Sequence, residues 1–195
     1  MITRKILVVC ATGKQGGALI EALLASKTSN FDIYGLTRDA ASNSAKKLMP
    51  RRSPWFKVIQ KFPNLFLSKL ALEFGVFSLL QCQAKTKRSR PKPLIDASVV
   101  NGIQHFVFTS VDRGGPSKSE NDPTYVPHFI TKYNIEKHLK EKAAGSPQKM
   151  AWTILRPVAF LDNLTPDFLG KSFSRIMKQM DPTKINMIGT KTLAG

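Results

Sequence analysis

Acidic residues are scarce in this chain, cysteine is nearly absent, and no long apolar run occurs. Of its 195 residues, 13 are acidic and 30 are lysine or arginine, which gives a net charge of +17 at pH 7. Two cysteines, Cys10 and Cys82, exclude a disulfide framework. Because both lie in or beside apolar runs, we expect buried, reduced thiols.

The short apolar runs also restrict where the protein works. None approaches the roughly 20 residues that cross a bilayer. Only four apolar residues precede Cys10 after the charged start, too few for the core of a signal peptide. We therefore expect no membrane partner and a cytoplasmic or nuclear location. The length suits one domain with a substantial core.

The excess positive charge is concentrated between Ser44 and Pro93. This stretch holds one acidic residue, Glu73, and twelve basic ones: Lys46, Lys47, Arg51, Arg52, Lys57, Lys61, Lys69, Lys85, Lys87, Arg88, Arg90 and Lys92. Such a block occurs in nucleic-acid-binding surfaces and also in solvated, irregular stretches. It lacks aromatic residues interleaved on a regular face and any reader motif, so we do not expect a nucleic-acid partner.

Strand-like and helix-like segments alternate along the chain without internal repeats. Short apolar runs predict strands at 6–9, 32–37, 55–60, 75–80, 105–110 and 152–155. Helical spacing predicts helices at 18–24, 40–48, 65–74, 94–101 and 128–142, and residues 85–93 and 112–127 are expected to be loops. This order predicts an α/β fold with a doubly wound parallel sheet of the Rossmann type.

A glycine-rich string stands between the first strand and the first helix. Such a turn brings backbone N–H groups close to a pyrophosphate, and the helix N-terminus adds favourable charge. The three positions of the dinucleotide pattern fall on Cys10, Gly13 and Gly16, so the first departs from glycine. An ordinary turn is the alternative. The string predicts a dinucleotide site formed by Ala11, Thr12, Gly13, Lys14, Gln15 and Gly16.

The second strand ends in a basic residue. An acidic residue there would hold the ribose 2′-hydroxyl of NAD, whereas the Arg38 guanidinium can pair with the 2′-phosphate of NADP. Lys14 is a second candidate for this phosphate, and a solvated surface arginine is the alternative for Arg38. The expected cofactor is NADP(H), and no metal site is expected.

Five strings together resemble the NmrA-like family, atypical members of the short-chain dehydrogenase/reductase group. They are Ala11–Gly17, Leu36–Arg38, Phe106–Gly115, Pro127–Lys132 and Trp152–Leu164. The resemblance covers about residues 4–48 and 94–170 and is weak at 49–93. It implies a Rossmann domain, a smaller C-terminal region that closes over the cofactor, NADP(H) binding, and a role as redox sensor or regulator. Some relatives are reductases.

On this resemblance, residues 1–165 form the NAD(P)-binding domain, irregular and basic at 49–93, and residues 166–195 begin the C-terminal substrate region. Three departures stand out: Cys10 replaces the usual glycine, Lys61-Phe62 replaces the usual Gly-Asp, and family members continue beyond Gly195. The basic, dissimilar middle and the early stop lead to the hypothesis of a truncated or mis-spliced product without function.

The resemblance also implies where a catalytic centre would lie. The family serine falls on Ser110, and the family lysine falls on Lys132, supported by Glu136. His128 stands where classical relatives have tyrosine, four residues before Lys132. Histidine can donate a proton near pH 7, and a polar residue at a helix start is the alternative.

A second Tyr-x-x-x-Lys spacing occurs at Tyr133 and Lys137. One residue of offset turns a helix by about 100°, so only one of the two pairs can face a nicotinamide. The family register favours His128 and Lys132, which makes Tyr133 a packing or surface residue. In relatives the loop at Arg156-Pro157 lies beside the nicotinamide, so Pro157 is a candidate cofactor contact, with a simple strand terminator as the alternative.

Three functions stay open at this stage. The first is an NADP(H)-binding sensor or regulator with little or no catalysis, which follows from the missing tyrosine and implies a regulatory protein partner. The second is an NADPH-dependent oxidoreductase that uses Ser110, His128 and Lys132. The third is nucleic-acid binding through the basic block at 44–93.

Overall fold

The computed structural model describes residues 4–26, 31–37, 39–48, 56–60, 76–79, 91–164, 171, 175, 178–179 and 186–194. Within these ranges six parallel strands form one sheet in the order β3-β2-β1-β4-β5-β6. The strands are β1 (Arg4–Val9), β2 (Phe31–Thr37), β3 (Phe56–Gln60), β4 (Val76–Leu79), β5 (His105–Thr109) and β6 (Ala151–Leu155). This order confirms the predicted doubly wound Rossmann sheet.

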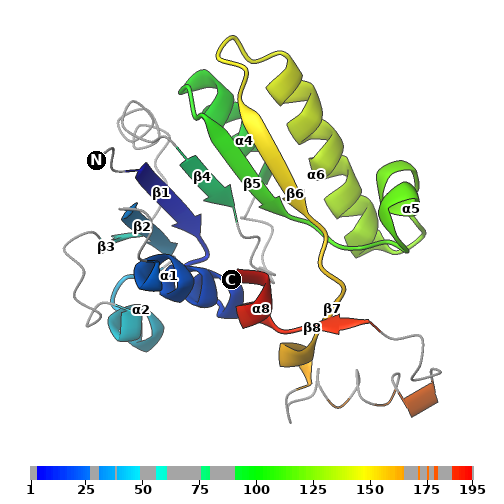
Figure 1. Ribbon diagram of the computed structural model, residues 1–195, viewed down its shortest axis with the longest axis horizontal. Helices are drawn as coiled ribbons and strands as arrows, with labels where there is room; N and C mark the ends of the chain where they lie inside the picture. The colour runs from blue at the N-terminus through cyan, green and yellow to red at the C-terminus, as the bar shows by residue number, and fades with distance from the viewer. Residues whose placement is uncertain are drawn as a thin grey trace.

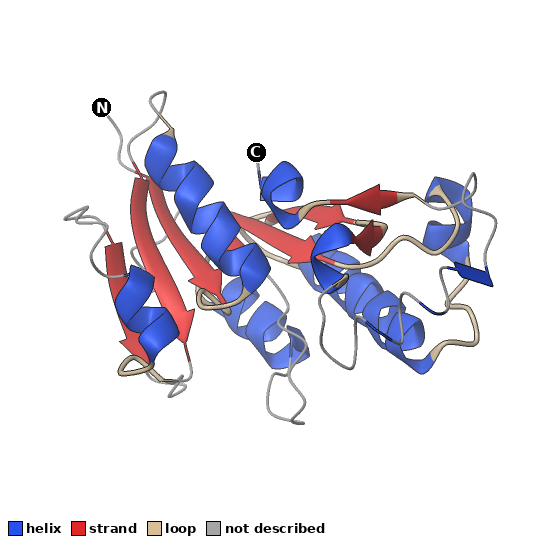
Figure 2. Ribbon diagram, turned by 90° about the horizontal axis from the view of Figure 1, so that it is seen from below, coloured by secondary structure: helices blue, strands red, loops and turns tan. Residues whose placement is uncertain are grey.

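Helices cover both faces of the sheet (Figures 1 and 2). They are α1 (Lys14–Ala25), α2 (Asn43–Leu48), α4 (Pro91–Val100), α5 (Pro116–Asn121) and α6 (Pro127–Ala144). Among these helices, together with the short one near the C-terminus, none combines the length and apolar character that a bilayer crossing requires. The predicted helix at 65–74, the loop at 85–90 and Cys82 lie outside the described residues.

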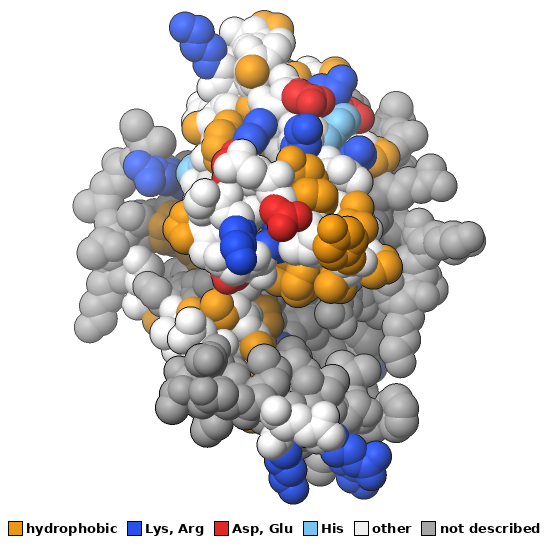
Figure 3. Space-filling model, turned by 90° about the vertical axis from the view of Figure 1, so that its right-hand side faces the viewer, with side chains coloured by type: hydrophobic (Ala, Val, Ile, Leu, Met, Phe, Trp, Pro, Cys, Tyr) orange, Lys and Arg blue, Asp and Glu red, His pale blue; other side chains and the backbone are white. Residues whose placement is uncertain are grey.

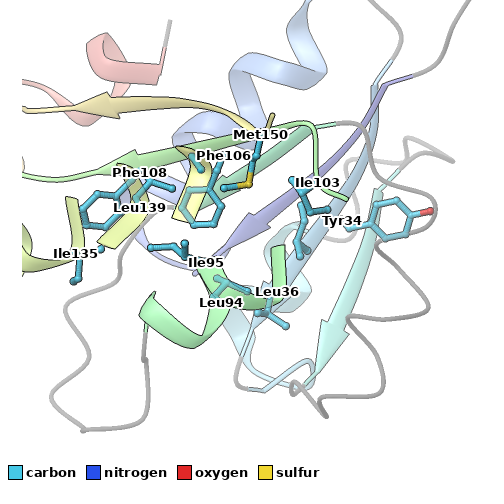
Figure 4. Packing of buried hydrophobic residues seen from close by; sticks show 12 residues of the cluster. Tyr34, Leu36, Leu94, Ile95, Ile103, Phe106, Phe108, Ile135, Leu139 and Met150 are labelled. Atoms are coloured by element: carbon cyan, nitrogen blue, oxygen red, sulfur yellow. The ribbon is translucent and has the colours of Figure 1, made fainter. Parts of the chain in front are cut away.

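The core has two parts, because successive side chains of a strand point to opposite faces. Ile6 and Val8 of β1 pack against Ile20 of α1 on one face. Leu7 belongs to the larger cluster on the other face, which is built mainly from β5, α4 and α6. Figure 4 shows Phe106 and Phe108 of β5 within this cluster, together with residues of α4 and α6. A strand buried on both faces explains the unbroken apolar run at 6–9.

Two stretches expected as loops contain helices. Residues 91–93 form the first turn of α4. Proline lacks a backbone N–H and has a fixed φ, and both properties suit a first helical turn. Within 112–127 the short helix α5 begins at Pro116, where the Asp112 carboxylate accepts hydrogen bonds from Gly115 N and Ser119 Oγ, each 3.1 Å long. Local polar capping forms this helix without an apolar repeat, so periodicity did not predict it.

After β6 the chain adds a second, small sheet. Strands β7 (Ala159–Phe160) and β8 (Met187–Ile188) pair in parallel, and the short helix η1 (Leu161–Asn163) follows β7. The last helix, α8 (Thr190–Ala194), packs against α1 and lies beside it in Figure 1. The expected boundary near residue 165 stays a prediction.

Candidate functional site

The turn between β1 and α1 is built from main-chain groups. Cys10 adopts a φ of 58°, in the left-handed region that glycine favours. Its carbonyl accepts a hydrogen bond from Gly13 N at 2.9 Å, and Gly13 stands at the N-cap of α1 without a side-chain cap. The turn therefore has the conformation that the glycine pattern predicts, even though a side chain stands at its first position. Cys10 is partly exposed, which corrects the expectation of a buried thiol.

Gly16 holds the helix close to the strand. A Cβ at this position would lie 2.3 Å from the carbonyl oxygen of Cys10, which is main chain and has little room to move. The neighbouring Gly17 has only the Ala11 oxygen in range, at 3.9 Å. Gly16 thus fills the third role of the dinucleotide pattern, close packing between helix and strand.

The end of β2 lies next to this turn. Ala11 N donates to the carbonyl of Leu36 at 3.1 Å, and the hydroxyls of Thr12 and Thr37 lie 3.5 Å apart. Asp39 follows and is exposed, with its carboxylate accepting from Ala41 N. Arg38, the predicted phosphate ligand, lies outside the described residues.

The turn fits a bound anion. Gln15 Nε2 is buried and has no hydrogen-bond partner within the described part of the chain. Buried donors are nearly always paired, so this amide is a candidate donor to a ligand oxygen. Together with the open N-cap of α1, it offers hydrogen bonds to phosphate oxygens.

Lys14, the first residue of α1, reaches across the sheet edge. Its ammonium donates to the main-chain oxygen of Asp162 in η1, at 2.5 Å. The Asp162 carboxylate in turn accepts from Thr190 N at 2.8 Å and from Thr190 Oγ1 at 3.1 Å. The turn is thereby joined to the segment that follows β6.

Ser110, at the end of β5, is buried and has its hydroxyl directed to a carboxylate. Ser110 Oγ donates to Glu136 Oε1 of α6, and Ser110 N donates to the carbonyl of Leu155 at 2.7 Å. Since the serine proton lies on the Glu136 side, Ser110 offers a ligand lone pairs rather than a proton.

Two arginines hold Glu136 in its charged form. Arg113 donates to both carboxylate oxygens, at 3.0 and 3.1 Å, and Arg156 Nη2 donates to Oε2 at 2.6 Å. Burial raises the pKa of Glu136, but the hydrogen bonds from Arg113, Arg156 and Ser110 outweigh it and leave this pKa below its usual value. Arg156 also pairs with Glu120 of α5 at 2.7 Å, so the cluster ties α5, α6 and β6 together.

Lys132 lies one helical turn before Glu136 and is also buried. Its ammonium donates to the carbonyl of Thr109 at 2.7 Å. Burial lowers the pKa of Lys132 to about 8, against a smaller upward influence of Glu136 and Cys10. Because β1 and β5 run parallel in one sheet, the β1 turn and the end of β5 that Lys132 contacts lie at the same edge.

The two candidates for the missing tyrosine differ in environment. His128 is exposed at the surface, and partial desolvation of its ring together with the nearby Lys132 charge lowers its pKa. The Tyr133 ring lies between two cations: Arg113 Cζ is 5.3 Å and Lys137 Nζ is 5.6 Å from its centroid. Cation–π contacts of this kind indicate that the Tyr133 ring has a packing role. The assignment of His128 stays a prediction.

The loops after β5 and β6 are joined by their backbones. Asp112 N donates to the carbonyl of Pro157 at 2.9 Å, and Pro157 is buried. Ser110, Lys132 and Pro157 are thus brought to one end of β5 and β6, whereas Gly13 and Lys14 stand at the end of β1. The Thr109 hydroxyl, in the last residue of β5, is buried and has no partner in the described ranges.

Exposed apolar side chains stand just before α6. Tyr125 is fully exposed and Val126 is 46% exposed, in the connection between α5 and α6 just before His128. Figure 3 looks onto the side where α5 lies and shows hydrophobic side chains gathered beside acidic and basic ones. In the described ranges, no group of histidine, cysteine and acidic residues could hold a metal ion.

Sequence reasoning missed Arg113, Asp162 and Thr190. Arg113 had a detectable signal, because it is a charged residue in the loop after a strand, within the string Phe106–Gly115. Asp162 and Thr190 gave none, since each acts through partners far away in the sequence.

Comparison with known proteins gives a family and a fold. A family model described as NmrA-like family matches residues 2–181. An NmrA-like family domain-containing protein of Dictyostelium discoideum is 25% identical over 82% of this chain and 52% of its own length. An NmrA-like family domain-containing oxidoreductase of Aspergillus hancockii is 31% identical over 60% of this chain and 36% of its own. The chain therefore spans about half the length, or less, of these curated relatives.

Solved structures share the fold. The triphenylmethane reductase of Citrobacter sp., crystallised with NADP(H), superposes with a TM-score of 0.67 at 16% identity. The match covers 97% of this chain and 62% of the reductase. Identity at this level supports the Rossmann architecture and leaves cofactor and activity to be argued from the residues of this chain.

Proposed function

The chain belongs to the NmrA-like family, and on this basis we propose that it binds NADP(H) at the turn between β1 and α1. We further propose that it works as a redox-sensing or transcription-regulatory protein with little or no catalysis, acting through a protein partner. Cofactor contacts are assigned to Ala11, Thr12, Gly13, Lys14, Gln15, Gly16, Arg38, Lys132 and Pro157.

The close approach at Gly16 carries the cofactor part of the proposal. The helix packs this near to its strand, its N-cap at Gly13 has no side-chain cap, and the buried Gln15 amide has no partner among the described residues. Backbone N–H groups and an unpaired amide suit phosphate oxygens, and the basic Lys14 and Arg38 favour the additional phosphate of NADP over NAD. The cofactor of the solved Citrobacter reductase agrees with this choice.

The hydrogen bond of the Ser110 hydroxyl supports the proposal of little or no catalysis. A serine that assists carbonyl reduction donates its proton to the substrate oxygen, but this proton is engaged by Glu136. Glu136 stays charged because Arg113 and Arg156 hold it, so it does not return a proton near neutral pH. No tyrosine stands four residues before Lys132.

An NADPH-dependent oxidoreductase is the second candidate. A relative named as an oxidoreductase favours it, and so does the lowered pKa of Lys132, which is typical of functional lysines. In this case the bound cofactor would supply a hydride. Lys132 would orient the cofactor, and His128 would carry the proton.

Dinucleotide titration by calorimetry tests the cofactor. We expect NADPH to bind more tightly than NADH by roughly tenfold to over a hundredfold, because a charge-assisted pair contributes about 1.5–3 kcal/mol. Arg38→Ala should remove most of this preference and leave NADH binding nearly unchanged. Arg4→Ala, at the opposite end of β1, is the matched control and should keep the preference. A folded parent that binds neither dinucleotide at millimolar concentration would refute the assignment.

Steady-state assays separate the two candidates. A sensor should show at most slow NADPH oxidation with a panel of carbonyl substrates. Steady turnover in the parent that is lost in Lys132→Ala when both proteins are saturated with NADPH would instead establish the oxidoreductase.

A further inference from the structure

The contact between Lys14 and Asp162 joins two parts of the chain that are distant in sequence and in the sheet. Asp162 follows β6, which is separated from β1 by β4 and β5. The chain must therefore turn back along the carboxyl edge of the sheet to bring Asp162 to the first residue of α1. Figure 1 shows this return, with β7, β8 and α8 leading back to α1. We refer to residues 159–164 and 186–194 as the strap.

Asp162 organises the strap through both of its functional groups. Its carboxylate accepts the main-chain N–H and the hydroxyl of Thr190, which fixes the start of α8. The N–H of Thr190 is the main reason that the pKa of Asp162 lies below its usual value, so the carboxylate is charged at neutral pH. Its main-chain oxygen meanwhile accepts the Lys14 ammonium.

The ammonium of Lys14 has capacity beyond this contact. A lysine carries three N–H donors, and Asp162 takes one of them. Lys14 also directly follows Gly13, where the turn offers its N–H groups to a phosphate. A flexible lysine loses considerable side-chain entropy when it is immobilised by a ligand. The Asp162 carbonyl holds the ammonium in place beforehand, which reduces that loss on binding.

We propose that Asp162 is a positioning residue for the dinucleotide: it holds Lys14 for a phosphate and anchors α8 to the same point. This inference rests on the proposed function, because it assumes a dinucleotide phosphate at the β1 turn. Phosphate binding by Lys14 and docking of the strap are then coupled. Since coupling is reciprocal, bound dinucleotide stabilises the strap, and the docked strap strengthens dinucleotide binding.

Substitutions in the strap test the proposal without changing the turn. Asp162→Ala keeps the main-chain carbonyl but removes the anchor of α8, and Thr190→Val removes one of the two hydrogen bonds. Both should raise the Kd for NADPH about threefold to tenfold, mainly through faster release in stopped-flow measurements. Thr190→Ser keeps the hydroxyl and should behave like the parent.

A double-substitution cycle tests whether Asp162 acts through Lys14. In a Lys14→Met background, Asp162→Ala should cause no further loss of NADPH affinity, because the ammonium that it positions is gone. An equal loss in both backgrounds would show a general structural effect and overturn the positioning role.

Amide exchange at Thr190 reports on the strap directly, since this N–H donates to Asp162. NADPH should slow the exchange in the parent, and Asp162→Ala should accelerate it without ligand. Unchanged or faster exchange with saturating NADPH would overturn the coupling while leaving the proposed function intact. A parent that binds no NADPH in the same experiment would refute the proposed function, and the positioning role with it.

Discussion

Two regions at the carboxyl edge of the sheet, the β1–α1 turn and the ends of β5 and β6, are polar by different means. At the β1–α1 turn the polar groups are mainly main-chain N–H and carbonyl groups, placed by close packing at Gly16 and by the unusual φ of Cys10. At the ends of β5 and β6 they are ionised side chains, with Glu136 between Arg113 and Arg156. A backbone site is sensitive to added atoms, whereas a buried ionic site is sensitive to a lost charge.

The two regions also suit different roles: the turn suits binding of a phosphate, and the ionic cluster holds neighbouring elements in place. Main-chain N–H groups stay polar whatever the pH, so the turn suits a phosphate that must be bound under all conditions. The ionic cluster satisfies its own charges and connects α5, α6 and β6, so it fixes the position of Ser110 and of the helix that carries Lys132. The following predictions test this contrast.

Removing Glu136 should have the largest effect. Glu136→Ala leaves the buried Arg113 and the partly buried Arg156 without their shared carboxylate, and breaking a buried pair costs about 3–5 kcal/mol in unfolding free energy. Urea denaturation measures this loss. Glu120→Gln is the matched control: its carboxylate is half-exposed on the same Arg156, and exposed pairs contribute at most about 1 kcal/mol. Equal losses for the two variants would show that the cluster is not the buried support described here.

Lys132 should make stability depend on pH at alkaline values. Its pKa is lowered to about 8 in the folded protein, below the ordinary 10.5 of the unfolded chain. Below pH 8 both states carry the proton, and the folded state bears the full cost of burying the charge. Between pH 8 and 10.5 the folded state loses the proton first, so Lys132 adds up to about 3 kcal/mol of stability as pH rises.

Comparison of the parent with Lys132→Met isolates this contribution. Unfolding free energies of both proteins are measured from pH 7 to 10.5. The value for the parent, relative to that for Lys132→Met, should increase as pH rises. Parallel curves would show that Lys132 keeps an ordinary pKa.

The sequence predicted the sheet better than the ionic cluster. Continuous apolar runs such as 6–9 report burial on both faces, and the glycine string locates the turn, because both signals are local. Glu136 was noticed only as support for Lys132. Its partners Arg113 and Arg156 lie 23 and 20 residues away in sequence, so only the fold brings them together.

Helix α5 was not predicted for a similar reason. Asp112 caps it through Gly115 and Ser119, and Ser119 Oγ also accepts a hydrogen bond from Arg113 N at 2.8 Å. A short helix with few apolar residues gives no periodicity, and its stability comes from contacts with the ionic cluster.

The two neighbouring glycines of α1 should respond oppositely to alanine. Gly16→Ala places a Cβ against the Cys10 carbonyl and should cost about 1–3 kcal/mol, since a helix and a strand must separate to accept it. Gly17→Ala adds a methyl group where the nearest atom is 3.9 Å away and should stabilise by about 0.5–1 kcal/mol through higher helix propensity. Thermal unfolding measures both. Loss of similar size in both variants would contradict the close approach at Gly16.

The smallest effect is expected where the turn departs from its own pattern. Cys10 holds a φ of 58°, a conformation that costs a residue with a side chain about 1–2 kcal/mol. Cys10→Gly removes this strain, although glycine loses about 0.5–1 kcal/mol more through its greater freedom in the unfolded chain. The net result should be a stabilisation of about 0.5–1 kcal/mol, visible as a higher Tm. Cys10→Ala keeps a Cβ at the same φ and should bring no gain, which separates strain from any effect of the thiol. If Cys10→Gly lowers the Tm instead, contacts of the thiol outweigh the strain. Side-chain contacts would then stabilise the turn as well, which would weaken its contrast with the Glu136 cluster.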